Sequence, residues 1–252
     1  MTYIYTFFSI LFLIALGGCD KKKEILEGDR QEVFRSIHAI RHEMTRDIRL
    51  ASPIVQDWPM SGGNAAHHSP VLNVSPNMKE IWRFSMDRGA SSDSRLLNGP
   101  IIAHNTVFTM DADGDVYAID LQTGTLRWST QTCSHGTQAF GGGLAYHEGR
   151  LFVVTALAEV MAIDAHTGSI LWRQSVSAPI RSTPTVDHNR LYVTSINNQL
   201  DVFECSTGHI LWSHMGITEN AGILGGSSPA VKDGIVVAPY SSGEVFGLRH
   251  DT

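Results

Sequence analysis

From about residue 100 onward, short apolar runs alternate with polar turn residues, and this pattern predicts β-strands. The runs come in groups of four, separated by turn pairs such as His104–Asn105, Asp113–Gly114 and Glu148–Gly149. Paired Asn, Asp and Gly residues suit two-residue hairpins, because both central residues then need a positive φ. This part of the chain is therefore expected to fold as antiparallel hairpins without helices between them.

One eleven-residue pattern returns three times, with an acid, then Thr-Gly, then Trp. It reads A-I-D-L-Q-T-G-T-L-R-W at 118–128, A-I-D-A-H-T-G-S-I-L-W at 162–172 and V-F-E-C-S-T-G-H-I-L-W at 202–212. The tryptophans are 44 and 40 residues apart. Four strands per repeat of this length are typical of a β-propeller blade. The predicted fold class is all-β, an incomplete propeller with three full four-stranded blades and three strands of a fourth.

Each residue of the repeated pattern has a structural interpretation. The glycine is expected to take a positive φ in the third turn of its blade, and the acid to accept hydrogen bonds within that turn. The tryptophan is expected to pack between neighbouring blades. Glu204 replaces the aspartate once, so no metal-binding role is expected for the acids. The residues with these predicted roles are Trp128, Trp172, Trp212, Asp120, Asp164, Gly124, Gly168 and Gly208.

A further tryptophan strand, E-I-W-R-F at 80–84, comes 46 residues before Trp128 with no blade strands ahead of it. We expect Trp82 to complete a blade whose other strands lie beyond residue 252. The alternative is that this strand completes the fourth blade in a small ring. The final V-F-G-L-R-H-D-T aligns with V-Y-A-I-D-L-Q-T, which places Thr252 at the position of Thr123. The chain is therefore expected to stop inside a hairpin turn, as a truncated product.

The composition, the cysteines and the candidate metal ligands reduce the number of functions to consider. The chain has 252 residues, 42% of them apolar, and a net charge of −6, which argues against a nucleic-acid partner. Cys133 and Cys205 fall at non-equivalent points of different repeats and are expected to be free thiols. His38 and His42 could share a helix face, but no third metal ligand is near. The stretch D-A-D-G-D at 111–115 is similar to a Ca²⁺-binding loop, but its glycine is at the wrong position for one. A hairpin turn explains this stretch.

The N-terminus predicts export and lipidation. Residues 3–16 form an uncharged apolar run that ends in L-G-G-C at 16–19, a pattern similar to a bacterial lipobox. We expect a lipoprotein signal peptide over 1–19 with acylation of Cys19; an ordinary signal peptide is the alternative. Residues 20–76 are expected to form an N-terminal tether, helical or extended over 24–55, and residues 77–252 the partial propeller.

The repeated blade pattern resembles that of the pyrroloquinoline-quinone-like (PQQ-like) propeller proteins. Four further motifs, together with the lipobox, resemble the alphaproteobacterial BamB family of outer-membrane assembly lipoproteins. These motifs are D-W-P-M-S-G-G-N-A-A-H at 57–67, G-G-L-A-Y at 142–146, S-A-P-I-R-S-T-P-T-V at 177–186 and G-G-S-S-P-A-V at 225–231. The resemblance implies an eight-bladed ring and a non-enzymatic scaffold without a cofactor, which holds the periplasmic POTRA domains of the barrel-inserting subunit BamA.

The resemblance also implies a contact site and a location. Ile180 and Arg181 match a Leu-Arg pair of the family that contacts BamA, whereas the family's assisting acidic residues have no match in the loop 223–229. The implied location is the periplasmic face of the outer membrane, although Asp20 after Cys19 leaves the inner membrane open. A quinoprotein dehydrogenase, which would need a Ca²⁺ site, a catalytic aspartate and usually a vicinal disulfide, is one alternative function. A non-functional truncated gene product is the other.

Overall fold

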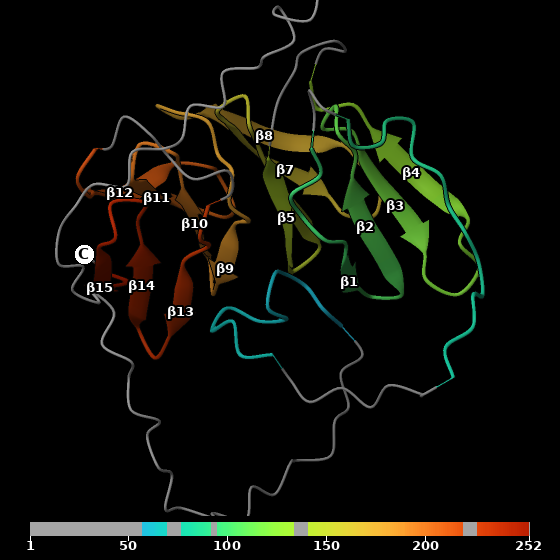
Figure 1. The fold of residues 1–252 in the computed structure, drawn as a ribbon, viewed down its shortest axis with the longest axis horizontal. Helices are drawn as coiled ribbons and strands as arrows, with labels where there is room; N and C mark the ends of the chain where they lie inside the picture. Colours follow the sequence, from blue (N-terminus) through green and yellow to red (C-terminus); the bar gives the residue numbers. More distant parts are fainter. Residues whose placement is uncertain (1–56, 70–76, 92–94, 134–140, 219–225, 252) are drawn as a thin grey trace, which may run out of the picture. The chain divides into compact units, whose positions relative to one another are not determined.

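The computed structural model describes residues 57–69, 77–91, 95–133, 141–218 and 226–251. The predicted signal peptide, Cys19, His38 and His42 lie outside these ranges. The described residues contain fifteen strands in three four-stranded antiparallel sheets and one three-stranded sheet (Figure 1). No helix in these ranges is long and apolar enough to cross a lipid bilayer. The all-β class and the incomplete set of four-stranded blades are thus as the repeat predicts.

The strands of each sheet follow one another in chain order, and each sheet is one blade. Blade 1 contains β1 (Ile101–Ala103), β2 (Thr106–Met110), β3 (Val116–Asp120) and β4 (Leu126–Thr130). Blade 2 contains β5 (Gly142–His147), β6 (Arg150–Thr155), β7 (Glu159–Asp164) and β8 (Ile170–Ser175). Blade 3 contains β9 (Thr185–Asp187), β10 (Arg190–Thr194), β11 (Gln199–Glu204) and β12 (Ile210–Met215). Blade 4 contains β13 (Ala230–Lys232), β14 (Ile235–Pro239) and β15 (Val245–Arg249).

The turns between strands have the backbone geometry that their residues favour. The first turns of blades 1, 2 and 4 place both central residues at positive φ, as type I′ hairpins require. These pairs are His104–Asn105, Glu148–Gly149 and Asp233–Gly234. In the third turns, Gly124, Gly168 and Gly208 have φ between 72° and 76°. The pairing of the third and fourth strands slips by one residue beside this turn in blades 1, 2 and 3, a bulge that bends the outer strand.

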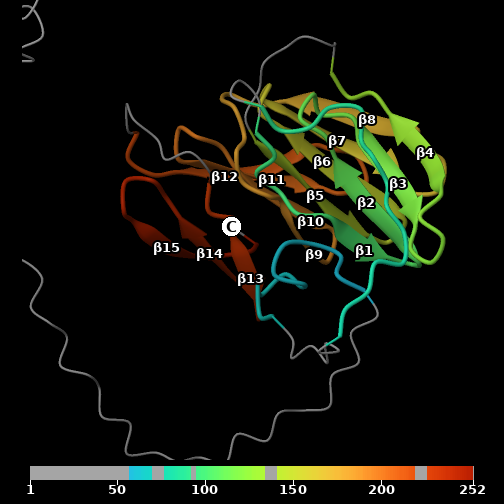
Figure 2. The ribbon, with the colours of Figure 1, turned by 45° about the vertical axis from the view of Figure 1, so that its right-hand side comes forward.

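Apolar side chains fill the space between neighbouring blades. Phe108 and Val116 of blade 1 pack against blade 2, and Phe152 and Val160 of blade 2 pack against blade 3. Tyr192, with its neighbours in blade 3, packs against blade 4 in the same way. The first strands β1, β5, β9 and β13 contact one another in sequence (Figures 1 and 2). Blades 1, 2 and 3 therefore each bury one face of their sheet only because the next blade covers it.

Residues 57–69 run along the first strands of all four blades. Trp58 exchanges two backbone hydrogen bonds with Ile102 of β1, with N···O distances of 2.7 and 2.9 Å. The Met60 side chain is buried in the core between blades 2 and 3. The other contacts, in blade order, are Tyr146 N–H to Pro59 O, His67 Nε2 to Thr185 Oγ1 and Val231 N–H to Ala65 O. Residues 57–69 thus pack as part of the propeller body, although the sequence analysis places them in a tether.

Candidate partner-binding surface

The repeated tryptophans connect each blade to the next. The indole N–H of Trp128 donates to the Ala165 carbonyl at 3.0 Å, and that of Trp172 to the Cys205 carbonyl at 3.0 Å. Trp212 donates to the His250 carbonyl at 3.1 Å in the same arrangement. In each case the acceptor is the residue that directly follows the last residue of the next blade's third strand.

The Thr-Gly turn of the next blade lies against the tryptophan ring. A Cβ atom added to Gly168 would lie 2.8 Å from atoms of the Trp128 ring, and one added to Gly208 would lie 2.7 Å from atoms of the Trp172 ring. These glycines therefore serve two purposes: they take a positive φ, and they leave room for the indole.

Trp82 makes the same contact at the start of the chain of blades. Its indole N–H donates to the Leu121 carbonyl at 2.9 Å, and its ring lies against Gly124. With Phe84 and Met86 it covers Val107, Tyr117 and Ile119 of blade 1. Residues 80–86 are not hydrogen-bonded into any sheet of the described chain. Trp82 thus occupies the position of an outer-strand tryptophan, but within the described ranges the predicted strand around it pairs with no other strand.

The acidic side chains of the repeat accept hydrogen bonds from the backbone of the third turn of their own blade. The Asp164 carboxylate accepts hydrogen bonds from the backbone N–H groups of His166 and Thr167, at 2.9 and 2.8 Å, and from the Thr167 hydroxyl. These bonds, led by the Thr167 backbone N–H, lower the pKa of Asp164 below its usual value. Asp120 closes its turn in the same way and also accepts from Arg127 Nη2 at 2.6 Å, the largest cause of its lowered pKa.

Ile180 and Arg181 lie on the connection between blades 2 and 3, and the two side chains have different environments. The Ile180 side chain is fully buried in the core between these blades, so it cannot reach a partner directly. The Arg181 side chain is half-buried, and its Nε–H group, although shielded from solvent, has no hydrogen-bond partner among the described residues. Any direct contact made by this pair therefore falls to Arg181, whose partner-binding role stays a prediction.

Arg181 lines a pocket at the junction of blades 3 and 4. The pocket is also lined by Thr194, whose hydroxyl is buried without a partner in the described chain, and by Tyr240. Asn198 and Ser241 also line this pocket. Asn198 Oδ1 accepts hydrogen bonds from the backbone N–H and the hydroxyl of Ser241 at 3.0 and 2.8 Å. Because these bonds connect turns of two blades, the surface around Arg181 is set by the packing of the blades rather than by a single loop.

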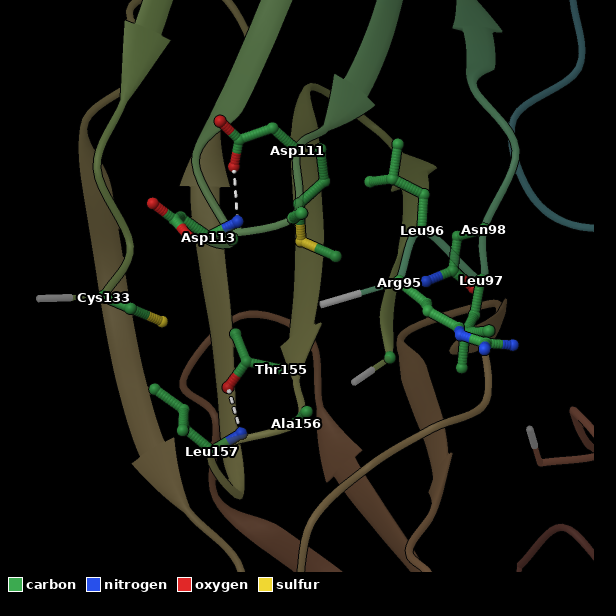
Figure 3. A pocket seen from close by; sticks show the side chains of 14 residues that line it. Arg95, Leu96, Leu97, Asn98, Asp111, Asp113, Cys133, Thr155, Ala156 and Leu157 are labelled. Atoms are coloured by element: carbon green, nitrogen blue, oxygen red, sulfur yellow. Dashed lines mark hydrogen bonds between the residues drawn. The ribbon is translucent and has the colours of Figure 1, made fainter. Parts of the chain in front are cut away.

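A second pocket lies between the corresponding turns of blades 1 and 2 (Figure 3). Arg95 and Asn98 lie on one side of it, and Cys133 lies on the other (Figure 3). Asp111 belongs to its lining, but both carboxylate oxygens are already engaged. Oδ1 accepts from the backbone N–H groups of Asp113 and Asp115 at 3.0 and 2.9 Å, and Oδ2 accepts from the Tyr117 hydroxyl at 3.1 Å. Residues 111–115 thus form a hairpin turn in which the Asp111 carboxylate accepts hydrogen bonds from the backbone of the same turn.

The described residues show no constellation that would hold a metal. No three His, Cys, Asp or Glu side chains within them are grouped in a way that could bind a metal ion. Cys133 and Cys205 are free thiols. Burial raises the pKa of the Cys205 thiol to about 12, which keeps it protonated and unreactive at neutral pH.

Two features of this surface are not evident from the sequence alone. The environment of the Arg181 Nε–H, which has no partner in the part of the chain that the structure describes, depends on how blades 2, 3 and 4 pack around it. The role of residues 57–67 depends on contacts with four strands that are far apart in the chain. The only available signal is the unusual W-P-M-S-G-G-N stretch, which has neither strand nor helix periodicity.

Comparisons with known proteins give two overlapping family matches. A family model described as "Outer membrane protein assembly factor BamB" matches residues 131–252. A model described as "Glucose/ethanol/alcohol dehydrogenase, beta-propeller domain" matches residues 58–171. Both descriptions belong to proteins with PQQ-like repeats, and together the two matches extend from residue 58 to residue 252.

Individual relatives agree with these matches. The chain is 27% identical over 185 residues to the outer membrane protein assembly factor BamB of Burkholderia pseudomallei. The aligned region covers 73% of this chain and 45% of that protein. It spans 38 to 45% of the length of the curated relatives that it matches.

Solved structures show the same fold. The crystal structure of BamB from Moraxella catarrhalis matches with a TM-score of 0.50 at 21% identity, over 65% of this chain and 51% of that chain. A quinohemoprotein alcohol dehydrogenase from Pseudomonas putida matches with a TM-score of 0.63 at 17% identity, over 78% of this chain and 39% of that chain. The repeat, the blades and these comparisons show a β-propeller fold with PQQ-like four-stranded blades.

Proposed function

We propose that this protein is a non-enzymatic scaffold lipoprotein of the outer-membrane β-barrel assembly machinery and that it binds the POTRA domains of BamA. The proposal is supported by the BamB family match over residues 131–252, which includes the whole of blades 2 and 3 and the three strands of blade 4. It is also supported by the identity to BamB of Burkholderia pseudomallei. The proposed location is the periplasmic face of the outer membrane, with the acylated Cys19 as anchor.

The contact site rests on one observation: Arg181 is half-buried, and its Nε–H has no hydrogen-bond partner among the described residues. A buried donor without an acceptor costs about 1–3 kcal/mol, which a partner recovers by supplying a carboxylate or carbonyl oxygen. Arginine is also over-represented among residues that dominate protein interfaces. A partner oxygen reaches this shielded donor only after the Arg181 side chain turns outward. An acidic or carbonyl-rich edge of a POTRA domain would then bind the guanidinium, and Ile180 would hold the connection in place from within the core.

Co-purification tests the contact. The full chain and its own organism's BamA are co-expressed, and the recovered amount of BamA is measured for wild type, Arg181→Glu and Arg181→Ala. We expect Arg181→Glu to reduce recovery at least tenfold and Arg181→Ala by less. Lys232→Glu is the matched control, because Lys232 is exposed at the far end of β13 from the Arg181 connection. Equal recovery for Arg181→Glu and Lys232→Glu, with both variants folded by circular dichroism, would refute the contact site.

Metabolic labelling tests the anchor. Cells that express the wild-type chain should incorporate radiolabelled fatty acid into it, and Cys19→Ser should abolish the label. Cys133→Ser is the control, because Cys133 is a half-buried thiol of the propeller body and should leave the label unchanged. Label that persists in Cys19→Ser would contradict lipidation at this residue.

The second candidate function is a quinone-dependent dehydrogenase, favoured by the dehydrogenase propeller match over residues 58–171. The described residues contain no group of three or more His, Cys, Asp or Glu side chains that could hold a metal ion. The discriminating assay is reduction of a redox dye by the purified chain with pyrroloquinoline quinone, Ca²⁺ and alcohols or aldose sugars. The scaffold proposal expects no quinone-dependent reduction, and a quinone-dependent rate would favour the dehydrogenase.

A further inference from the structure

His67 has a backbone conformation that is unusual outside hairpin turns. Its φ is +52°, whereas the other non-glycine residues of the described chain with a positive φ all lie in turns between paired strands. The side chain of Asn64 shapes the backbone here, because its Oδ1 accepts from the N–H groups of Ala66 and His68 at 3.1 and 3.2 Å. Such a strained conformation persists only where the surroundings hold it, and it often marks a functional position.

The His67 ring connects residues 57–69 to blades 3 and 4 through Thr185. His67 Nε2 lies 3.1 Å from Thr185 Oγ1, and the Thr185 hydroxyl donates to the Pro229 carbonyl at 2.6 Å. Because the hydroxyl has a single proton and gives it to Pro229, Thr185 Oγ1 can only accept from His67. Neutral His67 therefore has its proton on Nε2. One series of hydrogen bonds thus joins residues 57–69, strand β9 of blade 3 and the residue before β13 of blade 4.

The site around the His67 ring favours the neutral imidazole over the imidazolium. Thr185 is fully buried, and its hydroxyl is the acceptor that the described residues offer to the ring. The titratable side chains on the three elements around His67 are Asp57, His68, Asp187 and Lys232. None of them contributes to the pKa of His67, which burial lowers below its usual value of 6.5. No nearby carboxylate therefore compensates a positive charge on this ring.

Residues 64–69 cover the junction of blades 3 and 4, beside β9 and β13 (Figure 2). Val231 N–H of β13 donates to the Ala65 carbonyl at 2.7 Å, and the Ala65 side chain packs against the core between these two blades. At the other end of residues 57–69, Trp58 is held by its own two backbone hydrogen bonds to Ile102 of blade 1. Residues 64–69 can therefore leave their blades while the Trp58 contact stays intact.

We propose that residues 64–69 are a proton-sensitive latch on the junction of blades 3 and 4, which protonation of His67 releases from Thr185 and Val231. When the latch is open, the ring is in water and binds a proton at its usual pKa of 6.5; when it is closed, burial lowers that pKa. The latch is therefore most stable at neutral pH and weakens as the pH falls below 6.5. Blades 3 and 4 also form the pocket around Arg181, so the latch acts on the junction that shapes this pocket.

Hydrogen exchange followed by mass spectrometry tests the latch in the detergent-solubilised full chain. Peptides that contain β13 report on the Val231 amide, and the rates are corrected for the intrinsic pH dependence of exchange. Between pH 7.5 and 5.0, the protection of this amide should fall severalfold. The upper limit is about thirtyfold, which is the ratio of protonated to neutral histidine at pH 5 for a pKa of 6.5. Peptides that contain Ile102 of β1 should keep their protection, because the Trp58 contact does not open.

Two variants separate His67 from its neighbour. His67→Gln keeps a neutral N–H donor that does not titrate, so its β13 protection should not respond to pH. His68→Gln is the matched control, because His68 is exposed and its loss should leave the wild-type response unchanged. The proposal is overturned if His67→Gln responds like the wild type, if wild-type β13 protection does not change, or if β1 loses protection equally. If His67→Gln fails to fold by circular dichroism, an NMR titration of the wild-type ring decides, and a His67 pKa of 6.5 or higher overturns the latch.

Discussion

The contact between a Thr-Gly turn and the preceding tryptophan is tested by Gly208→Ala. Gly208 has a φ of +75°, and an added Cβ would lie 2.7 Å from two atoms of the Trp172 ring. Two penalties therefore add. A positive φ costs an alanine about 1–2 kcal/mol. Inserting a methyl group into a packed contact costs about 1–3 kcal/mol more. The expected total loss in free energy of unfolding is about 2–5 kcal/mol.

Gly149→Ala is the matched control. Gly149 has a φ of +78°, but an added Cβ would meet no heavy atom within 4 Å. It should therefore lose only the backbone term, about 1–2 kcal/mol. The difference between the two variants isolates the contact with the indole.

Urea unfolding followed by circular dichroism measures both variants, and each is repeated in a Trp172→Leu background. We expect Gly208→Ala to be less stable than Gly149→Ala by about 1–3 kcal/mol in the wild-type background. With leucine at 172 that difference should disappear, because the clash needs the ring. Equal losses for the two alanine variants in the wild-type background would show that the ring does not constrain Gly208, and the argument for the junction would fail.

Two further predictions concern pH. Burial raises the folded-state pKa of the Cys205 thiol from 9.0 to about 12, so its contribution to stability is complete below pH 9 and is lost as the pH rises toward 12. The urea midpoint of a Cys205→Ala variant should therefore decline less steeply with rising pH than that of the wild type. Equal slopes would show that burial of the thiol does not affect stability at alkaline pH. Hydrogen bonds from Thr167 and His166 lower the pKa of Asp164 below 3.8, so its contribution is complete above that pH and is lost as the pH falls through the folded pKa. The melting temperature of Asp164→Asn should therefore fall less than that of the wild type between pH 5 and 2, as measured by thermal melts across that range. An equal fall in both proteins would count against the hydrogen bonds of Asp164 within its turn.

The sequence predicts the blades well because their signals are local. A period-two apolar pattern, turn pairs and the Thr-Gly-Trp spacing each lie within about ten residues, and these features set strand limits and turn geometry. One local exception is the second turn of blade 2, where Ala158 takes a φ of +60°. Alanine does not favour this region, so the turn is determined by its neighbours: Val176 N–H donates to the Ala158 carbonyl at 2.9 Å.

The surface features could not be predicted because they depend on distant parts of the chain. Met60 is buried only because blades 2 and 3 meet around it. The Arg181 Nε–H finds no partner among the described residues because of the way three blades surround it. The exposure of Val245 follows from what covers its sheet and not from its own sequence, since the equivalent Val116 and Val160 are fully buried.

The tryptophan contact places little demand on the residue that receives it. The acceptor is a backbone carbonyl in every case, and it is supplied by a leucine, an alanine, a cysteine and a histidine at the four positions Leu121, Ala165, Cys205 and His250. A gene that duplicates or deletes one whole repeat therefore brings together two blades that have never been neighbours, yet the new pair still has a donor, an acceptor and a glycine of the right shape. A change in the number of blades would therefore leave this hydrogen bond intact at the new junction, whatever residue supplies the carbonyl.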